Sequence, residues 1–133
     1  MFKWSNPTAQ LLGRWQPWHD GHTALFEKAL EEFGQVCIMI RDVPREGSAN
    51  DRLPGQDDNP YIGEQVTGNI ITALAKKGYT EGVQYVIIRV PNIVDISYGR
   101  GVGYTFTEHD LGEKVHSISA TKIRAELREK GEL

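Results

Sequence analysis

Apolar residues recur along the chain with two different spacings. Three short apolar runs predict buried strands, at residues 9–13, 35–42 and 83–91. These runs show little alternation, which is typical of strands covered on both faces, as in parallel sheets. Three stretches with apolar residues three and four apart predict amphipathic helices, at residues 22–33, 61–77 and 119–130.

Strands that alternate with helices predict an α/β fold in which right-handed crossovers connect parallel strands. We therefore expect a single domain over residues 1–133, with a Rossmann-like parallel sheet and helices on both of its faces. Two stretches lack either spacing. Residues 43–60 are rich in Pro, Gly, Asp and Asn and predict a mobile loop. Residues 92–118 mix short apolar pieces with glycines, and we expect one or two short strands there.

Composition narrows the class of protein. Apolar residues make up 39% of the chain and charged residues 25%, which is ordinary for a folded domain. The longest apolar run, residues 36–40, is too short to span a membrane, and the first ten residues lack an apolar signal core. The net charge of −3 argues against general attraction to nucleic acid. The single Cys37 excludes a disulfide framework and favours a cytoplasmic setting.

The segment "GRWQPWHDGH", residues 13–22, lies where the first predicted strand passes into the first predicted helix. In open parallel sheets, ligands bind beyond the carboxyl ends of the strands. Gly13 and Gly21 allow a ligand close to the backbone. His19 and His22 would lie at a helix N-terminus, which favours anions. The segment therefore predicts a site for phosphate oxygens, although in isolation the two histidines could also be ordinary loop residues.

His19-Asp20-Gly21-His22 resembles the H-x-G-H signature of the nucleotidyltransferase superfamily. A second signature of that family, I-S-x-T-x-I-R, is matched by "ISATKIR" at residues 118–124. The wider segment resembles the G-R-F-Q-P-x-H-x-G-H form of archaeal-type nicotinamide-nucleotide adenylyltransferases, with Trp15 in place of the usual Phe. Cytidylyltransferases more often carry Phe-Asp where this chain has Gln16-Pro17, so the resemblance favours ATP as the donor.

The resemblance implies in-line attack of an acceptor phosphate on the α-phosphorus of a nucleoside triphosphate, with release of pyrophosphate. It implies Mg²⁺ bound mainly through the nucleotide phosphates, with no dedicated set of protein ligands. The catalytic residues that it implies are His19, His22 and Arg124. The nucleotide-binding residues that we predict are Gly13, Arg14, Trp15, Gly21, His22, Ser119, Thr121 and Arg124. Weaker candidates for the acceptor site follow the later strands or lie in the glycine-rich stretch: Arg41, Asp42, Asn92 and Arg100.

Simpler interpretations stay open for several of these residues. Ser119 could be a helix N-cap, Arg124 could be a solvated helix residue, and Trp15 and Trp18 could serve packing. Two other functions also stay open, a cytidylyltransferase acting on an alcohol phosphate and a non-catalytic nucleotide-binding module. The acceptor could be nicotinamide mononucleotide, another phosphorylated metabolite or sulfate. We expect no nucleic-acid or membrane partner, and the sequence leaves the oligomeric state open, a homo-oligomer included.

Overall fold

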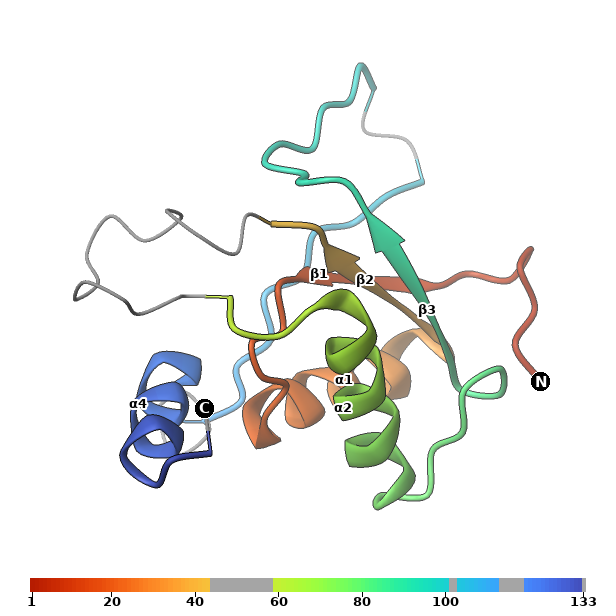
Figure 1. Cartoon of the computed structure of the whole chain (residues 1–133). Coiled ribbons are helices and arrows are strands. Elements are labelled where there is room, and N and C mark those ends of the chain that lie inside the picture. The colour runs from red at the N-terminus through yellow and green to blue at the C-terminus, as the bar shows by residue number, and fades with distance from the viewer. Residues whose placement is uncertain (44–58, 101–102, 113–118, 133) are drawn as a thin grey trace.

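The computed structural model describes residues 1–43, 59–100, 103–112 and 119–132. Three parallel strands form one sheet in the order β1-β2-β3, with bounds Ala9–Gly13, Val36–Arg41 and Tyr85–Val90. Three helices accompany them, with bounds Asp20–Phe33 for α1, Gly63–Ala75 for α2 and Ala120–Glu129 for α4. The α/β class, the parallel sheet and all six predicted elements are therefore confirmed (Figure 1).

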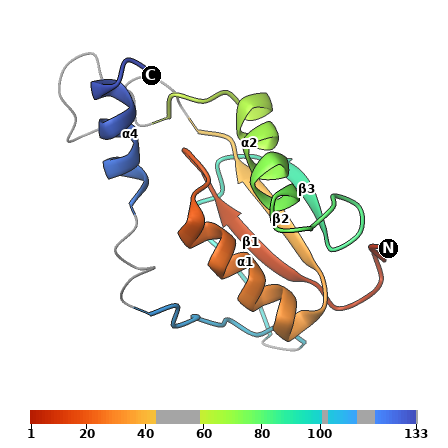
Figure 2. The ribbon, with the colours of Figure 1, turned by 90° about the horizontal axis from the view of Figure 1, so that it is seen from below.

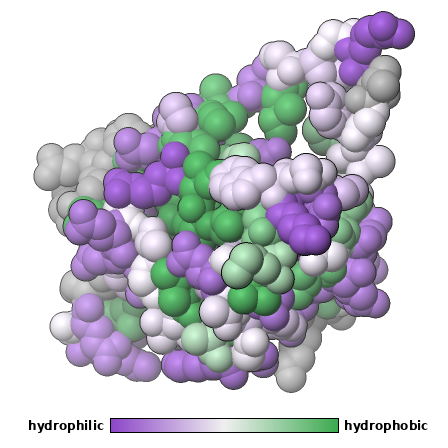
Figure 3. All heavy atoms as spheres, turned by 90° about the vertical axis from the view of Figure 1, so that its right-hand side faces the viewer, coloured by the Kyte–Doolittle hydropathy of each residue, from purple (hydrophilic) through white to green (hydrophobic). Residues whose placement is uncertain are grey.

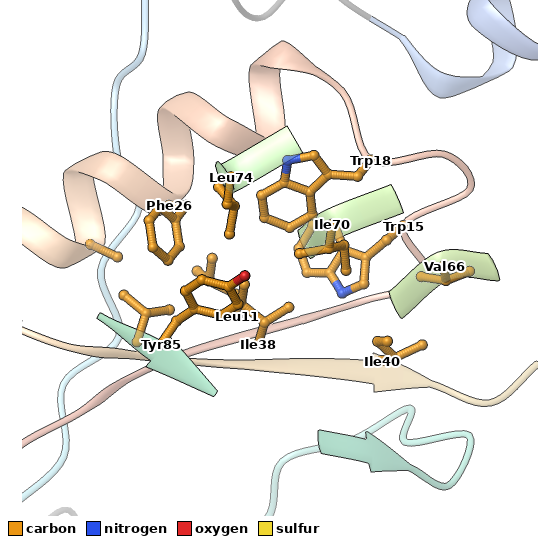
Figure 4. Packing of buried hydrophobic residues seen from close by; sticks show 12 residues of the cluster. Leu11, Trp15, Trp18, Phe26, Ile38, Ile40, Val66, Ile70, Leu74 and Tyr85 are labelled. Atoms are coloured by element: carbon orange, nitrogen blue, oxygen red, sulfur yellow. The ribbon is translucent and has the colours of Figure 1, made fainter. Parts of the chain in front are cut away.

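Helices α1 and α2 pack on the same face of the sheet (Figures 1 and 2). The expectation of helices on both faces is not met in the described residues. The strand order explains this arrangement, because β1, β2 and β3 follow one another in a single direction. Two successive right-handed crossovers in one direction place both helices on one side. The core lies between that face and the two helices, with Phe26 of α1 and Ile70 of α2 packed over Ile38 and Tyr85 (Figure 4).

The ends of α1 follow the signals in the sequence. Gly34 closes the helix in the left-handed conformation, with φ +87°, and its N–H donates to the Leu30 carbonyl. The turn then leads directly into β2, where Cys37 is buried, as predicted. At the other end of the helix, residues 14–19 join the carboxyl end of β1 to the N-terminus of α1, and the histidine segment lies there.

Residues 91–100 and 103–112 form neither strand nor helix, so the strands expected within 92–118 are absent from the part described. Residues 91–100 project from the body of the molecule, and residues 103–112 return to it (Figure 1). Both parts carry exposed apolar side chains, including Val94 and Phe106. The face of the molecule on the right-hand side of Figure 1 mixes hydrophobic and polar patches (Figure 3). Of the predicted mobile loop at 43–60, residues 44–58 lie outside the described part. No described helix is both long enough and apolar enough to cross a membrane.

Candidate active site

His19 and His22 lie at the start of α1, as the sequence predicts. His19 is the N-cap residue, and its Nδ1 accepts hydrogen bonds from the backbone N–H groups of Gly21 (3.0 Å) and His22 (3.3 Å). In return, Nδ1 of His22 accepts the backbone N–H of His19 at 3.1 Å. The first turn of a helix leaves its N–H groups without partners inside the helix, and here the two imidazoles supply them.

These hydrogen bonds determine which nitrogen of each ring carries the proton. A neutral imidazole has one N–H, so a ring whose Nδ1 accepts must carry its proton on Nε2. Burial lowers the pKa of His19, although Asp20 nearby opposes the shift. Burial, followed by the charge of His19, lowers the pKa of His22 to about 3. Both rings are therefore neutral at physiological pH, and each offers an Nε2–H donor at a helix N-terminus.

Trp15 and Trp18 pack against the second histidine. The ring centroids of Trp15 and His22 are 4.7 Å apart in an edge-to-face arrangement, and those of Trp18 and His22 are 5.4 Å apart. Each indole N–H is anchored, Trp15 to the Met39 carbonyl at 3.0 Å and Trp18 to the Thr23 hydroxyl at 2.8 Å. Both tryptophans belong to the core (Figure 4), so packing is the contribution that the structure shows for the predicted nucleotide-binding residue Trp15.

Gly13 is required by this packing. A Cβ atom at Gly13 would lie 2.9 Å from two carbons of the Trp15 indole, closer than real Cβ contacts come. Trp15 itself adopts φ +55°, which a bulky side chain rarely adopts. The sequence suggests that Gly13 lets a ligand come close to the backbone. In the structure the Trp15 indole, from the same segment, takes that place. Gly21, by contrast, is buried in the first turn of α1 and offers its N–H to His19.

Helix α4 lies beside the segment that joins β1 to α1 (Figures 1 and 2). Its N-cap is Ser119, whose hydroxyl accepts the Lys122 N–H at 3.4 Å, while Thr121 is exposed in the first turn. Arg124 is only 1% exposed. Its Nη1 donates to the Gln16 carbonyl at 2.6 Å, and its Nη2 donates to the Thr121 hydroxyl at 3.2 Å. Arg124 therefore joins the two motifs of the chain, and is a buried rather than a solvated helix residue.

Two polar contacts join the histidine segment to the residues that precede α2. Arg14 donates from Nη1 to Oδ1 of Asn59 at 2.9 Å, and Asn59 is fully buried. Gln16 pairs with the backbone of Tyr61 in both directions, each bond 2.9 Å long. Sequence reasoning missed Gln16, Asn59 and Tyr61 as site residues. Apart from its place in the resembling motif, the signal for Gln16 was a polar residue between Trp15 and Pro17 in the otherwise apolar stretch 15–18, and a polar side chain is buried there only with a partner.

A cavity of about 200 Å³ opens at the carboxyl ends of β2 and β3, next to the start of α2. Arg41 and Asp42, two predicted acceptor residues, line it together with Arg89, which sequence reasoning missed. Within the described residues, neither guanidinium forms an ion pair. Nε of Arg41 is buried without a hydrogen-bond partner, and Nη1 donates to the Ile93 carbonyl at 3.3 Å. The Arg89 guanidinium occupies the space that a Cβ of Gly63 would need.

The other two predicted acceptor residues lie elsewhere. Asn92 is exposed after β3 and does not line this cavity. Arg100 lines a separate open hollow of about 1160 Å³, bounded by β1, α1 and residues 96–100 and 103–109. No group of three or more His, Cys, Asp or Glu side chains suited to a metal ion is found in the part of the chain that the structure describes. Neither family models nor curated proteins match this chain.

Proposed function

We propose that this protein is a nucleotidyltransferase that moves an adenylyl group from ATP to a small phosphorylated acceptor and releases pyrophosphate. The observation that carries the proposal is the histidine pair, two neutral rings that present Nε2–H donors at the N-terminus of α1. Such donors suit the oxygens around an α-phosphorus, where negative charge develops during transfer. The likeness of both motifs to those of nucleotidyltransferases supports the same reaction.

The second motif would bind the remaining phosphates of ATP. Ser119 and Thr121 place hydroxyl and N–H donors in the first turn of α4, and helix N-termini favour anions. In this arrangement Arg124 supports the site through Gln16 and Thr121. Mg²⁺ would be bound mainly through the phosphates of ATP, because this ion keeps most of its water and needs few protein ligands. The single Cys37 fits a reducing, cytoplasmic setting.

The cavity at β2 and β3 would receive the acceptor. Arg41 and Arg89 bring two guanidinium groups to it, and guanidinium binds phosphate through parallel hydrogen bonds. The N-terminus of α2 adds a positive dipole end. Among the described residues that line it, Asp42 is the one with an acidic side chain, and it would orient the acceptor rather than bind phosphate. An acceptor with one phosphate group therefore suits the cavity.

A pyrophosphate-release assay over the four nucleoside triphosphates tests this function. Each would be combined with Mg²⁺ and with nicotinamide mononucleotide, alcohol phosphates, other phosphorylated metabolites or sulfate. We expect ATP with a phosphorylated acceptor to give release. CTP with an alcohol phosphate would instead indicate a cytidylyltransferase. A nucleotide-dependent rise in melting temperature without any release of pyrophosphate would indicate a binding module. If no nucleotide gives release and none raises the melting temperature, the proposal is refuted.

A further inference from the structure

Gln16 connects three segments that are far apart in the sequence. Its side chain is 5% exposed and makes two hydrogen bonds with Tyr61, donating from Nε2 to the carbonyl and accepting the N–H at Oε1. Its own carbonyl accepts from Nη1 of Arg124 in α4. One residue of the histidine segment therefore contacts both the residues that precede α2 and the helix that carries the second motif.

The two connections serve different parts of the candidate site. The backbone carbonyl holds Arg124, and through it Thr121 at the start of α4. The side chain holds Tyr61, and both Gln16 and Tyr61 line the cavity that contains Arg41. We propose that Gln16 is a positioning residue whose amide fixes the acceptor cavity relative to the nucleotide site. This inference rests on the proposed function, since it assigns the two half-sites to acceptor and nucleotide.

Only an amide of this length can make both bonds to Tyr61. Methionine has nearly the same shape but would leave the N–H and the carbonyl of Tyr61 without these partners. Glutamate could still accept the N–H, but it cannot donate to the carbonyl and would add negative charge to a cavity with two arginines. Gln16→Met should therefore disturb the cavity, and Gln16→Glu should disturb phosphate binding there further through charge.

The chain offers a matched control at the opposite end of the sheet. Gln35 precedes β2, is 6% exposed, and pairs with the backbone of Lys3 in both directions, accepting the N–H at 3.0 Å and donating to the carbonyl at 2.7 Å. Gln35→Met removes the same kind of backbone clamp from a place that does not line the cavity. If Gln16 only stabilises the fold, Gln16→Met and Gln35→Met should change phosphate binding to the same extent.

The first test needs no turnover. Inorganic phosphate would be titrated into the full chain while the side-chain NMR signals of Arg41 and Arg89 report binding in the cavity. Loss of two hydrogen bonds predicts binding about tenfold weaker in Gln16→Met, and Gln35→Met within twofold of the wild type. Faster hydrogen exchange at the Tyr61 N–H would show directly that the clamp has opened. Equally weakened phosphate binding in Gln16→Met and Gln35→Met would overturn the proposal. Unchanged phosphate binding in Gln16→Met, although its Tyr61 N–H exchanges faster, would also overturn it.

The second test separates the two half-sites. With ATP and nicotinamide mononucleotide, we expect the acceptor KM to rise about tenfold in Gln16→Met and the ATP KM to stay within twofold, because the backbone carbonyl that holds Arg124 is kept. If Gln16→Met does not fold, Gln16→Glu should show the same division, since it retains one bond to Tyr61. Equal rises in both KM values would contradict the assignment. Absence of turnover in the wild type with every acceptor named above would refute the proposed function and leave the phosphate titration to decide the role of Gln16.

Discussion

His19 and His22 stack with their ring centroids 3.6 Å apart and their planes inclined by 19°, and the backbone N–H of each residue donates to the Nδ1 of the other. Two imidazolium rings at this separation would repel each other, and a protonated Nδ1 could not accept these bonds. The pair is therefore built to be neutral in the free protein. A bound polyphosphate would therefore meet two neutral Nε2–H donors at this helix N-terminus.

Replacement of His22 by Asn separates its two roles. The Asn side-chain oxygen can still accept the His19 N–H, whereas the Nε2–H donor is lost. We expect a folded protein with turnover reduced about 10²–10³-fold, the usual result of removing one transition-state donor. His22→Ala should also lose the hydrogen bond from the His19 N–H, at a further cost of about 1 kcal/mol. Circular dichroism and pyrophosphate release measured together would test this, and wild-type turnover in folded His22→Asn would contradict the assignment.

The lowered pKa of His22 predicts loss of stability in acid. An unfolded histidine takes up a proton below about pH 6.5, whereas folded His22 does so only near its pKa of about 3. The unfolded state therefore binds more protons between these values, and the free energy of unfolding falls as the pH falls. His22 alone should remove about 1–2 kcal/mol by pH 5, and His19 adds to this in the same direction.

Urea unfolding of the wild type and of His22→Asn between pH 7.5 and pH 4.5 would measure the effect. The variant lacks the buried imidazole, so its stability should fall less steeply below pH 6.5. Parallel curves for the two proteins would show that other groups, chiefly carboxylates, cause the acid sensitivity. A steeper curve for the variant would contradict the buried neutral pair itself.

Local signals in the sequence predict the elements of this fold well. Apolar spacing gives all three strands and all three helices, and Gly34 and Ser119 mark helix ends as expected. These signals act within a few residues, so they depend little on the rest of the chain. The side of the sheet on which a helix packs depends instead on strand order, which apolar spacing does not encode. For this reason the expectation of helices on both faces is not met in the described residues.

The sequence indicates those parts of the candidate site that depend on residues close together in the chain. It does not indicate the contacts between residues that are far apart in the chain. The start of a helix at His19 and His22 depends on nearby residues, so the sequence predicts it, whereas the mutual capping of the two rings was not expected. The contact between Gln16 and Arg124 joins residues 108 positions apart. It requires the guanidinium to be buried, whereas an arginine in an amphipathic helix is ordinarily solvated. Arg89 was missed for a similar reason, because a single charge inside an apolar strand gives no indication of the cavity that it faces.

Gly63 and Gly68 in α2 offer a paired test of the acceptor cavity. A Cβ at Gly63 would lie 2.4 Å from the central guanidinium carbon of Arg89, whereas a Cβ at Gly68 would meet nothing within 4 Å. Both glycines are helical, so alanine should favour the helix at either position, by about 0.5–1 kcal/mol at Gly68. At Gly63 the new methyl group must push the flexible end of Arg89 away from its present place. We therefore expect Gly63→Ala to bind inorganic phosphate more weakly in the cavity, about five- to tenfold if one hydrogen bond from Arg89 is lost.

Gly68→Ala should raise the free energy of unfolding and leave phosphate binding unchanged. Thermal unfolding and the phosphate titration on both variants would separate helix stability from the position of Arg89. Arg89→Met provides the reference for complete loss of the guanidinium. If Gly63→Ala binds phosphate as the wild type does while Arg89→Met does not, the guanidinium tolerates displacement and its present position is not needed. If Arg89→Met also binds normally, Arg89 takes no part in the cavity, and the acceptor phosphate must be sought at Arg41 alone.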